Sequence, residues 1–564
     1  MTTEVPRPSA HAAGETSGPG AASSAWSPLR NPVFRGLWLA TVVSTTGTWM
    51  HDVGAAWLMT SLEASPLFVS LLQTAASLPV FLLALPAGAL ADIVDRRRLL
   101  LTTQAWMFGV AAALGTLTVL GLTTPWLLLA FTFALGIGSA LNGPAWQAVP
   151  ADVVSRAELP AAAALEGIGF NIARAIGPAV GGLIVAAAGS GAVFLLNAAS
   201  FIAVLVALFR WRRSQAASGY PGERWAGAVR AGWRYVLHAA PLRTVLVRTG
   251  AFIVCGSVVW SLLPVVGRQE LGLTSLEYGV LLGCLGTGAV GGAMLLPRLR
   301  RRLSEDALVA VATVLWAAVA AALAYVRVYG LLCIVMAAGG MGWIAMMSSL
   351  NAAAQAALPG WVRARGLAFY LLVFQGGMAL GGVLWGMTAE SVGVTAALLL
   401  AAGGLMAGLL AAVAYPLKAV GGLDLAASLH WPAPAVAVEP GAERGPVLVL
   451  VDYRIDPQRV PDFVATMGEL EVVRRRDGAF QWGLFRDIAD PARWVETFLV
   501  ESWGEHLRQH ERHTVTDRSV EERVRSLHSG ERPPTVTHLL WGAAVLADGG
   551  QEMGLGAHSS GEGR

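Results

Sequence analysis

The 564-residue chain has only 3 cysteines, and charged residues make up only 14% of it. Cys255, Cys284 and Cys333 lie inside apolar runs without CxxC or Cys/His spacing, which is typical of small buried hydrophobic side chains. The formal net charge is +3, and the basic residues, nearly all arginine, occur in short clusters. Because no long basic face is present, we expect no nucleic-acid partner.

Two kinds of segment are also missing. The sequence has no Gly-rich phosphate-binding loop, so it offers no visible ATP site. Residues 1–30, rich in Ala, Ser, Gly and Pro, lack the apolar core of a signal peptide, and we expect a disordered cytoplasmic N-terminus there. What the chain has in excess is hydrophobicity, at 55% hydrophobic residues and a mean hydropathy of +0.57. It is predicted to be a membrane protein.

About twelve apolar runs follow, each close to the ~20 residues that cross a hydrocarbon core. The predicted spans are 36–61, 66–91, 98–121, 124–149, 158–187, 190–210, 242–267, 275–297, 304–327, 329–357, 364–390 and 393–415. Arginines gather in alternate loops, at 96–98, 156, 210–243, 298–302 and 363–365. Since cytoplasmic loops hold an excess of Lys and Arg, this alternation predicts a multi-pass protein of the cell membrane with both termini in the cytoplasm.

An internal repeat divides the spans into two groups. "LNGPAWQAVP" (141–150) ends the fourth span and "LNAAAQAALP" (350–359) ends the tenth, which predicts six-helix bundles over 31–210 and 242–415. Between them, 211–241 is predicted to be a cytoplasmic linker helix. Trp225, Val229, Trp233 and Val236 share one face of it, with Arg224, Arg230 and Arg234 nearby. This pattern fits an amphipathic helix on the inner membrane surface, and a solvated linker is the alternative.

The stretch "GALADIVDRRRLL" (88–100) after the second span resembles the signature of the major facilitator superfamily. Gly88, Leu90, Ala91, Asp92, Arg96 and Arg97 match it, whereas Ile93 and Asp95 depart from it. The resemblance implies alternating access by two six-helix halves and a cytoplasmic lock. In this lock Asp92 faces the positive start of the eleventh span, beside Arg363 and Arg365. The alternative is that these charges only set the topology.

The fifth span carries "ARAIGPAVGG" (173–182), which resembles the antiporter motif of superfamily exporters. Gly177, Gly181 and Gly182 allow close helix packing, and Pro178 frees a backbone carbonyl. An ordinary small-residue packing face is the alternative. With "NPVFRGLW" (31–38) and "TWMHDVGAAWLM" (48–59), the motif resembles the branch that contains the enterobactin exporter.

Charges inside the spans are functional candidates because each is costly in a membrane. Asp52 and Arg174 lie at similar depth, which predicts either a static ion pair or a proton-coupling pair, and Glu166 is shallower. Five amides are candidates for polar contacts in a central substrate cavity: Asn142, Gln147, Asn351, Gln355 and Gln375. Hydrogen bonding between helices is their alternative role.

After a linker at 416–445, residues 446–541 read as a soluble domain of order βαββαβ, which predicts a ferredoxin-like fold; 542–564 is predicted to be a disordered tail. The domain is similar to the antibiotic-biosynthesis-monooxygenase domains, which implies a possible homodimer through the sheets. His506, His510 and His513 fall on one helical face and are predicted to be exposed, with no metal and no cofactor.

The predicted fold class is thus an all-α membrane protein of twelve helices in two six-helix repeats, followed by a small α+β domain. We expect a secondary exporter of a small amphipathic molecule, such as a drug, siderophore or secondary metabolite, coupled to protons. We do not expect an enzyme. The alternative is a membrane-anchored monooxygenase-like enzyme or sensor that acts through the C-terminal domain.

Overall fold

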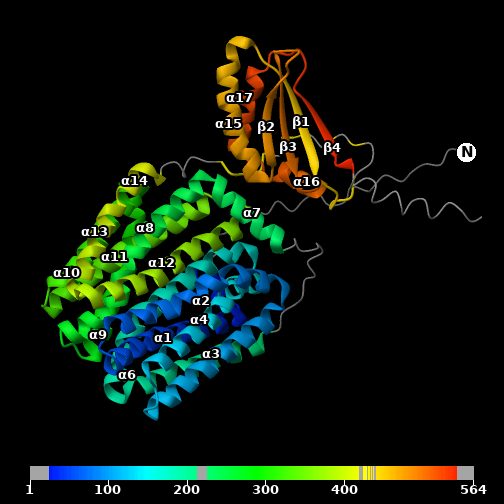
Figure 1. Cartoon of the computed structure of the whole chain (residues 1–564). Helices are drawn as coiled ribbons and strands as arrows, with labels where there is room; N and C mark the ends of the chain where they lie inside the picture. Colours follow the sequence, from blue (N-terminus) through cyan, green and yellow to red (C-terminus); the bar gives the residue numbers. More distant parts are fainter. Residues whose placement is uncertain are drawn as a thin grey trace, which may run out of the picture.

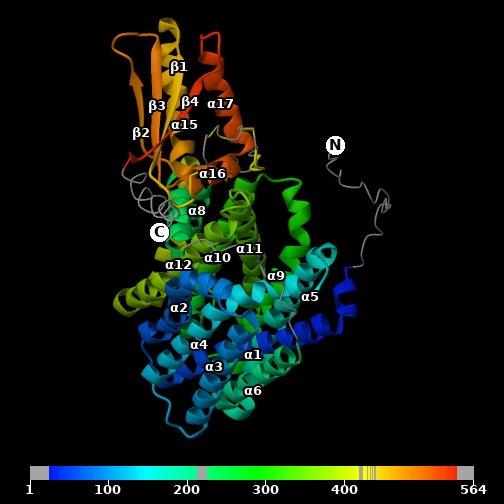
Figure 2. The same ribbon diagram turned by 90° about the vertical axis from the view of Figure 1, so that its right-hand side faces the viewer.

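The computed structural model describes residues 25–211, 225–417 and 424–542, except 429, 432–433, 435 and 437–439. A large helical body carries a small C-terminal domain on one end (Figures 1 and 2). The predicted N-terminal segment and C-terminal tail lie almost entirely outside the described residues.

The first half of the body contains the helices before residue 211. They are α1 (Pro32–Leu62), α2 (Pro66–Ile93), α3 (Arg96–Val119), α4 (Pro125–Gln147), α5 (Val149–Val153) and α6 (Leu159–Arg210). Prolines at the first turns of α1, α2 and α4 suit positions whose N–H lacks a helical partner. The predicted spans 158–187 and 190–210 are joined as α6, which is interrupted at Gly189 by a positive φ of 79°.

The second half follows the linker helix α7 (Trp225–His238). It contains α8 (Ala240–Val265), α9 (Ser275–Arg300), α10 (Glu305–Tyr325), α11 (Tyr329–Ala356), α12 (Arg363–Val392), α13 (Val394–Gly408) and α14 (Ala411–Ala414). Gly393, with φ of 90°, separates α12 from α13. In the described part of the chain, ten helical segments are long and apolar enough to cross a membrane; the merged Arg156–Arg210 counts once and α1 is not among them.

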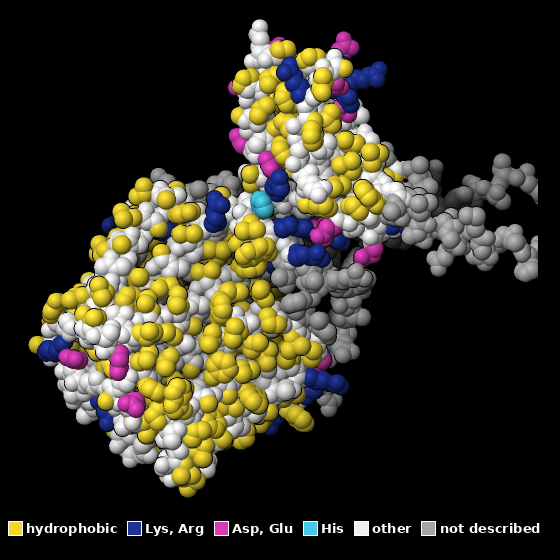
Figure 3. All heavy atoms as spheres, viewed as in Figure 1, with side chains coloured by type: hydrophobic (Ala, Val, Ile, Leu, Met, Phe, Trp, Pro, Cys, Tyr) yellow, Lys and Arg dark blue, Asp and Glu magenta, His cyan; other side chains and the backbone are white. Residues whose placement is uncertain are grey.

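Hydrophobic side chains cover most of the visible surface of the body (Figure 3). Leu82, Leu384 and Met387 are among the large apolar residues exposed there, at 56%, 41% and 57%. Charged side chains gather near the junction with the C-terminal domain. Such an apolar surface suits a lipid environment and would aggregate in water.

The C-terminal domain is built on a four-stranded antiparallel sheet of order β2-β3-β1-β4. Its elements are β1 (Val447–Arg454), α15 (Val460–Asp477), β2 (Phe480–Arg486), β3 (Arg493–Val500), α16 (Trp503–Arg512), α17 (Val515–Leu527) and β4 (Thr535–Leu540). Alternate β1 residues such as Val449 and Val451 are buried with Phe463 and Leu470 of α15 and Val524 of α17. Both helices therefore cover the same face of the sheet.

Candidate functional site

The two halves of the body meet through glycines. We call the helix ends nearer the C-terminal domain proximal and the opposite ends distal. A Cβ at Gly182 of α6 would overlap the carbonyl oxygen of Ser275 at the start of α9, whose hydroxyl donates to the Gly182 carbonyl at 3.2 Å. α2 of the first half and α12 of the second half also approach each other closely, and the Thr74 hydroxyl donates to the Ala379 carbonyl at 2.8 Å. These contacts hold the distal parts of the halves together.

The other motif glycines pack within the first half. A Cβ at Gly177 would lie 2.7 Å from the Cβ of Trp49, and one at Gly181 would lie 2.8 Å from the Cα of Met50. Both neighbours belong to α1. The predicted antiporter-like motif of Gly177, Pro178, Gly181 and Gly182 thus lies where α6 crosses α1 on one side and α9 on the other.

Arg174 lies just proximal to this crossing, inside an aromatic cluster. Its guanidinium carbon is 5.8 Å from the ring centroids of both Trp49 of α1 and Trp260 of α8, so it bridges the two halves. The residue is 5% exposed, and its Nε and Nη2 atoms have no hydrogen-bond partner among the described residues. Cation–π contacts of ~2 kcal/mol or more at desolvated sites offset part of the cost of burying this charge.

The structure does not bring Asp52 and Arg174 together as the predicted ion pair. Within the described chain, no carboxylate oxygen lies within 4.0 Å of the Arg174 guanidinium. Asp52 is exposed on α1, while its neighbour His51 is 4% exposed and packs 4.5 Å from the Phe194 ring. The depth argument placed both charges at one level but could not fix the directions in which their side chains point.

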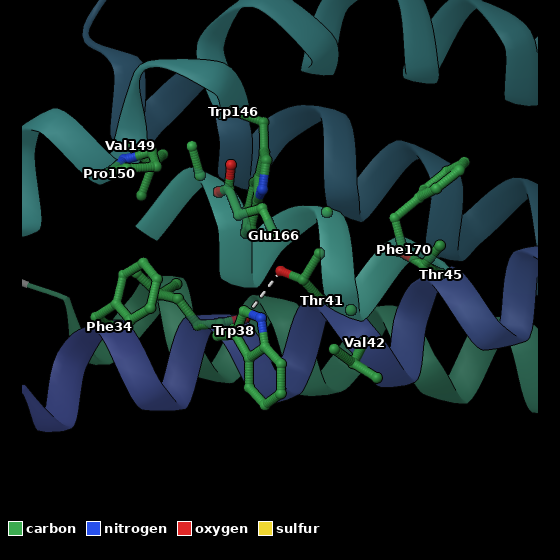
Figure 4. Close-up of a pocket in the computed structure, with 14 residues that line it drawn as sticks. Phe34, Trp38, Thr41, Val42, Thr45, Trp146, Val149, Pro150, Glu166 and Phe170 are labelled. Atoms are coloured by element: carbon green, nitrogen blue, oxygen red, sulfur yellow. Dashed lines mark hydrogen bonds between the residues drawn. The ribbon is translucent and has the colours of Figure 1, made fainter. Parts of the chain in front are cut away.

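Glu166 lines a proximal pocket of about 480 Å³ within the first half. Figure 4 shows its carboxyl group directed into the space between α1 and the ends of α4 and α5, near Trp146 and Thr41. Phe170, one turn further along α6, lines the same pocket and meets Trp49 edge-on at 6.2 Å. Glu166, Phe170 and Arg174 therefore form one face of α6 that leads from the pocket to the aromatic cluster.

The predicted lock residues make contacts inside the first half. Arg96 pairs with Asp152 at the end of α5 at 2.6 Å. Arg97 donates to the carbonyls of Leu208 and Phe209 at the end of α6, at 3.0 and 2.8 Å, where the negative end of the helix favours a cation. The side chain of Asp92 lies outside the described residues.

The other members of the predicted lock lie on α2 and α12, which pack against each other. Gly88 has open space around its Cα. Arg363, at the start of α12, is exposed, and Arg365 is half-buried. Because the Asp92 side chain lies outside the described residues, its predicted contact with the start of α12 stays a prediction.

The structure gives hydrogen-bond partners to three of the five predicted cavity amides. The Asn142 oxygen accepts from Thr103 and Gln104 of α3 at 3.2 and 3.3 Å, so this amide joins two helices. The Gln355 amide donates to Asn351 at 2.6 Å along the same helix. Gln147 is exposed at the end of α4 and Gln375 is half-buried in α12.

The predicted linker helix packs against protein on the side that is described. The α7 residue Tyr235 donates its hydroxyl to the Ala357 carbonyl at 2.9 Å, and Trp233 lies 5.9 Å from Phe369 of α12. Toward the C-terminal domain, Arg234 pairs with Glu505 of α16 at 2.9 Å. α7 thus contacts both the second half of the body and the C-terminal domain. Arg224 and the side chains of Trp225 and Val229 lie outside the described residues.

A second cavity, of about 1300 Å³ and open to solvent, lies between the C-terminal domain and the segment that precedes β1. Val449, Val451 and Phe498 form an apolar wall, and His506, His510 and His538 line another part. Burial and the neighbouring His538 lower the pKa of His506 to about 3 and that of His510 to about 4, so both are neutral at pH 7.

The prediction that His506, His510 and His513 are exposed is wrong, because two of them are buried and His510 is half-buried. His506 is 2% exposed and His513 is 1% exposed. Part of the predicted linker folds back over the end of the helix, where the Ser428 N–H donates to the His513 carbonyl at 2.9 Å and the Trp431 ring lies 4.8 Å from the His513 ring. His506 instead packs against His538 of β4, with ring centroids 4.6 Å apart. No local pattern in the sequence predicts a contact between segments so far apart in the chain.

Sequence reasoning also missed the aromatic cluster. Trp260, Trp316 and Trp343 of three second-half helices lie with ring centroids 4.8 to 6.5 Å apart, and Trp49 reaches them from the first half. The signal available was the 20 tryptophans of the chain. Tryptophan is enriched at the two membrane–water interfaces, so its number alone does not predict contacts between spans, which depend on helix rotation.

Curated relatives match parts of the chain. A staphyloferrin A transporter of Staphylococcus aureus is 32% identical over 164 residues, which is 29% of this chain and 41% of the relative. The multidrug efflux pump Tap of Mycobacterium tuberculosis is 27% identical over 288 residues, 49% of this chain and 68% of the pump. The chain therefore spans less than half of the first of these relatives.

Solved transporter structures share the fold of the body. The nucleoside transporter NupG aligns with a TM-score of 0.54 at 13% identity, and the alignment covers 68% of this chain and 98% of NupG. A bacterial homologue of the lysosomal transporter Spinster, inward-facing and unoccupied, aligns with a TM-score of 0.53 at 12% identity, covering 70% of this chain and 97% of the homologue. The family model described as transmembrane secretion effector matches residues 23–545 and includes the C-terminal domain. The chain therefore belongs to the transmembrane secretion effector family of major facilitator superfamily transporters.

Proposed function

We propose that the protein exports small amphipathic molecules across the cell membrane by alternating access. Relatives named as a multidrug efflux pump and a siderophore transporter support this direction and this class of solute. One observation carries the proposal: the halves touch distally at Gly182 and Ser275, while a pocket with a carboxylate is present proximally. Rocking about the distal contact would expose the other side.

The solute site that we propose is the face from Glu166 through Phe170 to Arg174, together with Trp49 and Trp260. Flat rings give contact area to a bulky apolar part, while the unpaired Arg174 donors favour an acceptor oxygen on the solute. The amides Gln147 and Gln375 are candidates for further polar contacts.

Efflux-deficient bacteria that express the full chain should resist part of a panel of amphipathic antibiotics and dyes, and should accumulate less of those compounds. Uptake into everted vesicles, with and without a proton gradient, checks this directly. An Arg174→Ala chain of equal abundance is the comparison, and we expect a loss of at least about tenfold in transport of solutes with an acceptor oxygen. A wild-type chain that moves no member of the panel would contradict the proposal.

We further propose twelve spans with both termini in the cytoplasm. The ten membrane-capable segments become twelve when α6 is counted as two spans at Gly189 and α1, 31 residues long, is added. The proximal ends would then face the cytoplasm, where Arg96 and Arg97 lie.

Cysteine labelling tests this orientation. Single cysteines in place of Arg97, Arg301 and Ser529, on a background without the native three, are expected to resist a membrane-impermeant thiol reagent in intact cells. They should react once the cells are broken open. A cysteine at exposed Val328, on the distal side, is the control that should react in intact cells. Labelling of any of the first three from outside contradicts the model.

Finer assignments also remain proposals. The order β2-β3-β1-β4 with two helices on one face supports a ferredoxin-like fold of the monooxygenase-like kind for the C-terminal domain. Exposed Val536 and Leu539 at the β4 edge support a homodimer through the sheets.

We also assign the chain to the enterobactin-exporter branch, on its motifs at 31–38 and 173–182. We further propose that Asp92 faces the start of α12 and helps to close the cytoplasmic side.

A further inference from the structure

A cluster of candidate metal ligands lies where the segment before β1 meets the C-terminal domain. His430 Nε2 is 2.9 Å from Glu521 Oε2, and His513 Nε2 is 3.7 Å from Glu521 Oε1. Within this trio, one ligand atom from each residue lies within 4.8 Å of the other two. Two imidazoles and a carboxylate are a donor set that first-row divalent metals bind in proteins.

His513 has unused bonding capacity. It is 1% exposed, and neither of its ring nitrogens has a hydrogen-bond partner in the described structure. Its Nε2 points to Glu521, and its Nδ1 lies 3.7 Å from Asp477 Oδ2 on the other side. A buried imidazole without a partner is costly, and an ion at the Nε2 side would satisfy it.

The surroundings resemble the outer shell of a metal site. Metal-bound histidines usually give their second nitrogen to an oxygen, which fixes the ring. His430 Nδ1 lies 2.8 Å from the Ser428 hydroxyl, and His513 Nδ1 faces Asp477. The carboxylate of Glu521 is held by the Trp431 indole N–H at 2.8 Å and by Arg474 at 2.8 Å.

The charge balance favours a cation. The buried carboxylates around His513 are Glu496, Glu521, Asp477 and Asp517, and the guanidiniums bound to them are Arg474 and Arg476. Four negative and two positive charges leave a net charge of −2 among the buried groups. Arg525, 3.8 Å from Glu521 on the exposed rim, reduces this excess to −1. A cation beside Glu521 would neutralise the negative charge that remains.

A second arrangement of ligands shares His513 with Asp477 and Asp517. Arg476 already donates to both oxygens of each of these carboxylates at 2.6 to 3.0 Å. Asp517 Oδ2 also accepts from the backbone N–H and the hydroxyl of Thr514, so it has no free lone pair, whereas each Glu521 oxygen accepts one N–H from Trp431 or Arg474 and keeps a lone pair for an ion. The side with His430 and Glu521 has a further advantage, because both residues line the cavity of about 1300 Å³. A metal there would keep a coordination position open to the cavity.

We propose that His430, His513 and Glu521 bind one divalent first-row transition metal ion, with Zn²⁺ as the reference ion, on the wall of the C-terminal cavity. The ion would join the segment that leaves the helical body to α17 of the domain. It would also offer its open position to a solute with an oxygen or nitrogen donor. This inference goes beyond export and does not depend on it.

The test uses the full chain, purified with an affinity tag that contains no histidine and stripped with a chelator. Zn²⁺ is added back and bound metal is counted by mass spectrometry, and Co²⁺ is added in parallel to read its visible absorption. We expect about one ion per chain and a Co²⁺ spectrum of a four- or five-coordinate site. His430→Ala and Glu521→Gln should each weaken binding at least about tenfold.

The matched control is His538→Ala, which removes an imidazole from the same cavity but not from the trio, and it should keep wild-type metal content. His430→Ala is the principal variant because it changes the segment and leaves the buried helices intact; thermal unfolding checks that its domain is folded. A wild-type chain that binds neither ion at one per chain overturns the proposal. Retention of wild-type affinity by folded His430→Ala and Glu521→Gln also overturns it.

Discussion

Replacement of Gly182 by alanine is expected to reduce export at least about tenfold while the protein remains folded in the membrane. The new Cβ would overlap the carbonyl oxygen of Ser275 and lie 3.2 Å from the Cα of Gly279, and both neighbours are backbone atoms of the other half. Backbone cannot rotate away as a side chain can. The variant should therefore disfavour the state in which the distal ends are closed, and a bias of ~1.4 kcal/mol suffices for a tenfold change in populations.

The prediction is checked by transport together with distal accessibility. A cysteine at Ser70, which is fully buried where α2 meets α12, reports opening of the distal side on a background without the native cysteines. Its labelling from outside should rise several-fold in the Gly182→Ala chain. Gly109→Ala on α3 of the same half is the control, because nothing lies within 4 Å of the new Cβ outside the adjoining helix backbone and Gly109 does not line the proximal pocket. Wild-type export and labelling in Gly182→Ala would show that this crossing does not open.

The helices could be predicted because their signals are local. Apolar length and the alternation of arginine clusters placed each predicted span on a helix. Even the boundary between 158–187 and 190–210 is marked by a positive φ at Gly189. The small-residue motif at 177–182 was predictable for the same reason, since glycine permits close approach whatever the partner.

What could not be predicted depends on rotation about helix axes and on contacts between distant segments. Depth along a helix put Asp52 beside Arg174, but the angle around α6 turns the guanidinium toward Trp49 and Trp260. For Asn142 the sequence left two roles open, a cavity contact or a hydrogen bond between helices, and its oxygen accepts from α3. His513 was expected in water and is covered by a segment about 85 residues earlier in the chain.

The rotation of α1 and α6 about their axes also changes which carboxylate is the better candidate for proton coupling. Asp52 was the first choice from the sequence because of its depth, with Glu166 as the next. Glu166 lies on the wall of the proximal pocket with Phe170 (Figure 4). The same helix face continues one turn further to Arg174. A coupling group must meet both water and the solute path as the halves move, and the pocket provides the first of these.

Glu166→Gln is therefore expected to abolish uphill export while solute binding and downhill exchange persist, because the amide fills the same space but cannot carry a proton. Asp52→Asn should keep at least about half of the wild-type coupled transport, since its side chain lies outside the pocket lining. The measurement is substrate-driven proton movement in reconstituted vesicles for the wild type and both variants, with solute binding measured on the same samples. If Glu166→Gln still moves protons at the wild-type ratio while Asp52→Asn does not, the coupling group is Asp52. Glu166 would then serve the pocket only as a polar contact for the solute.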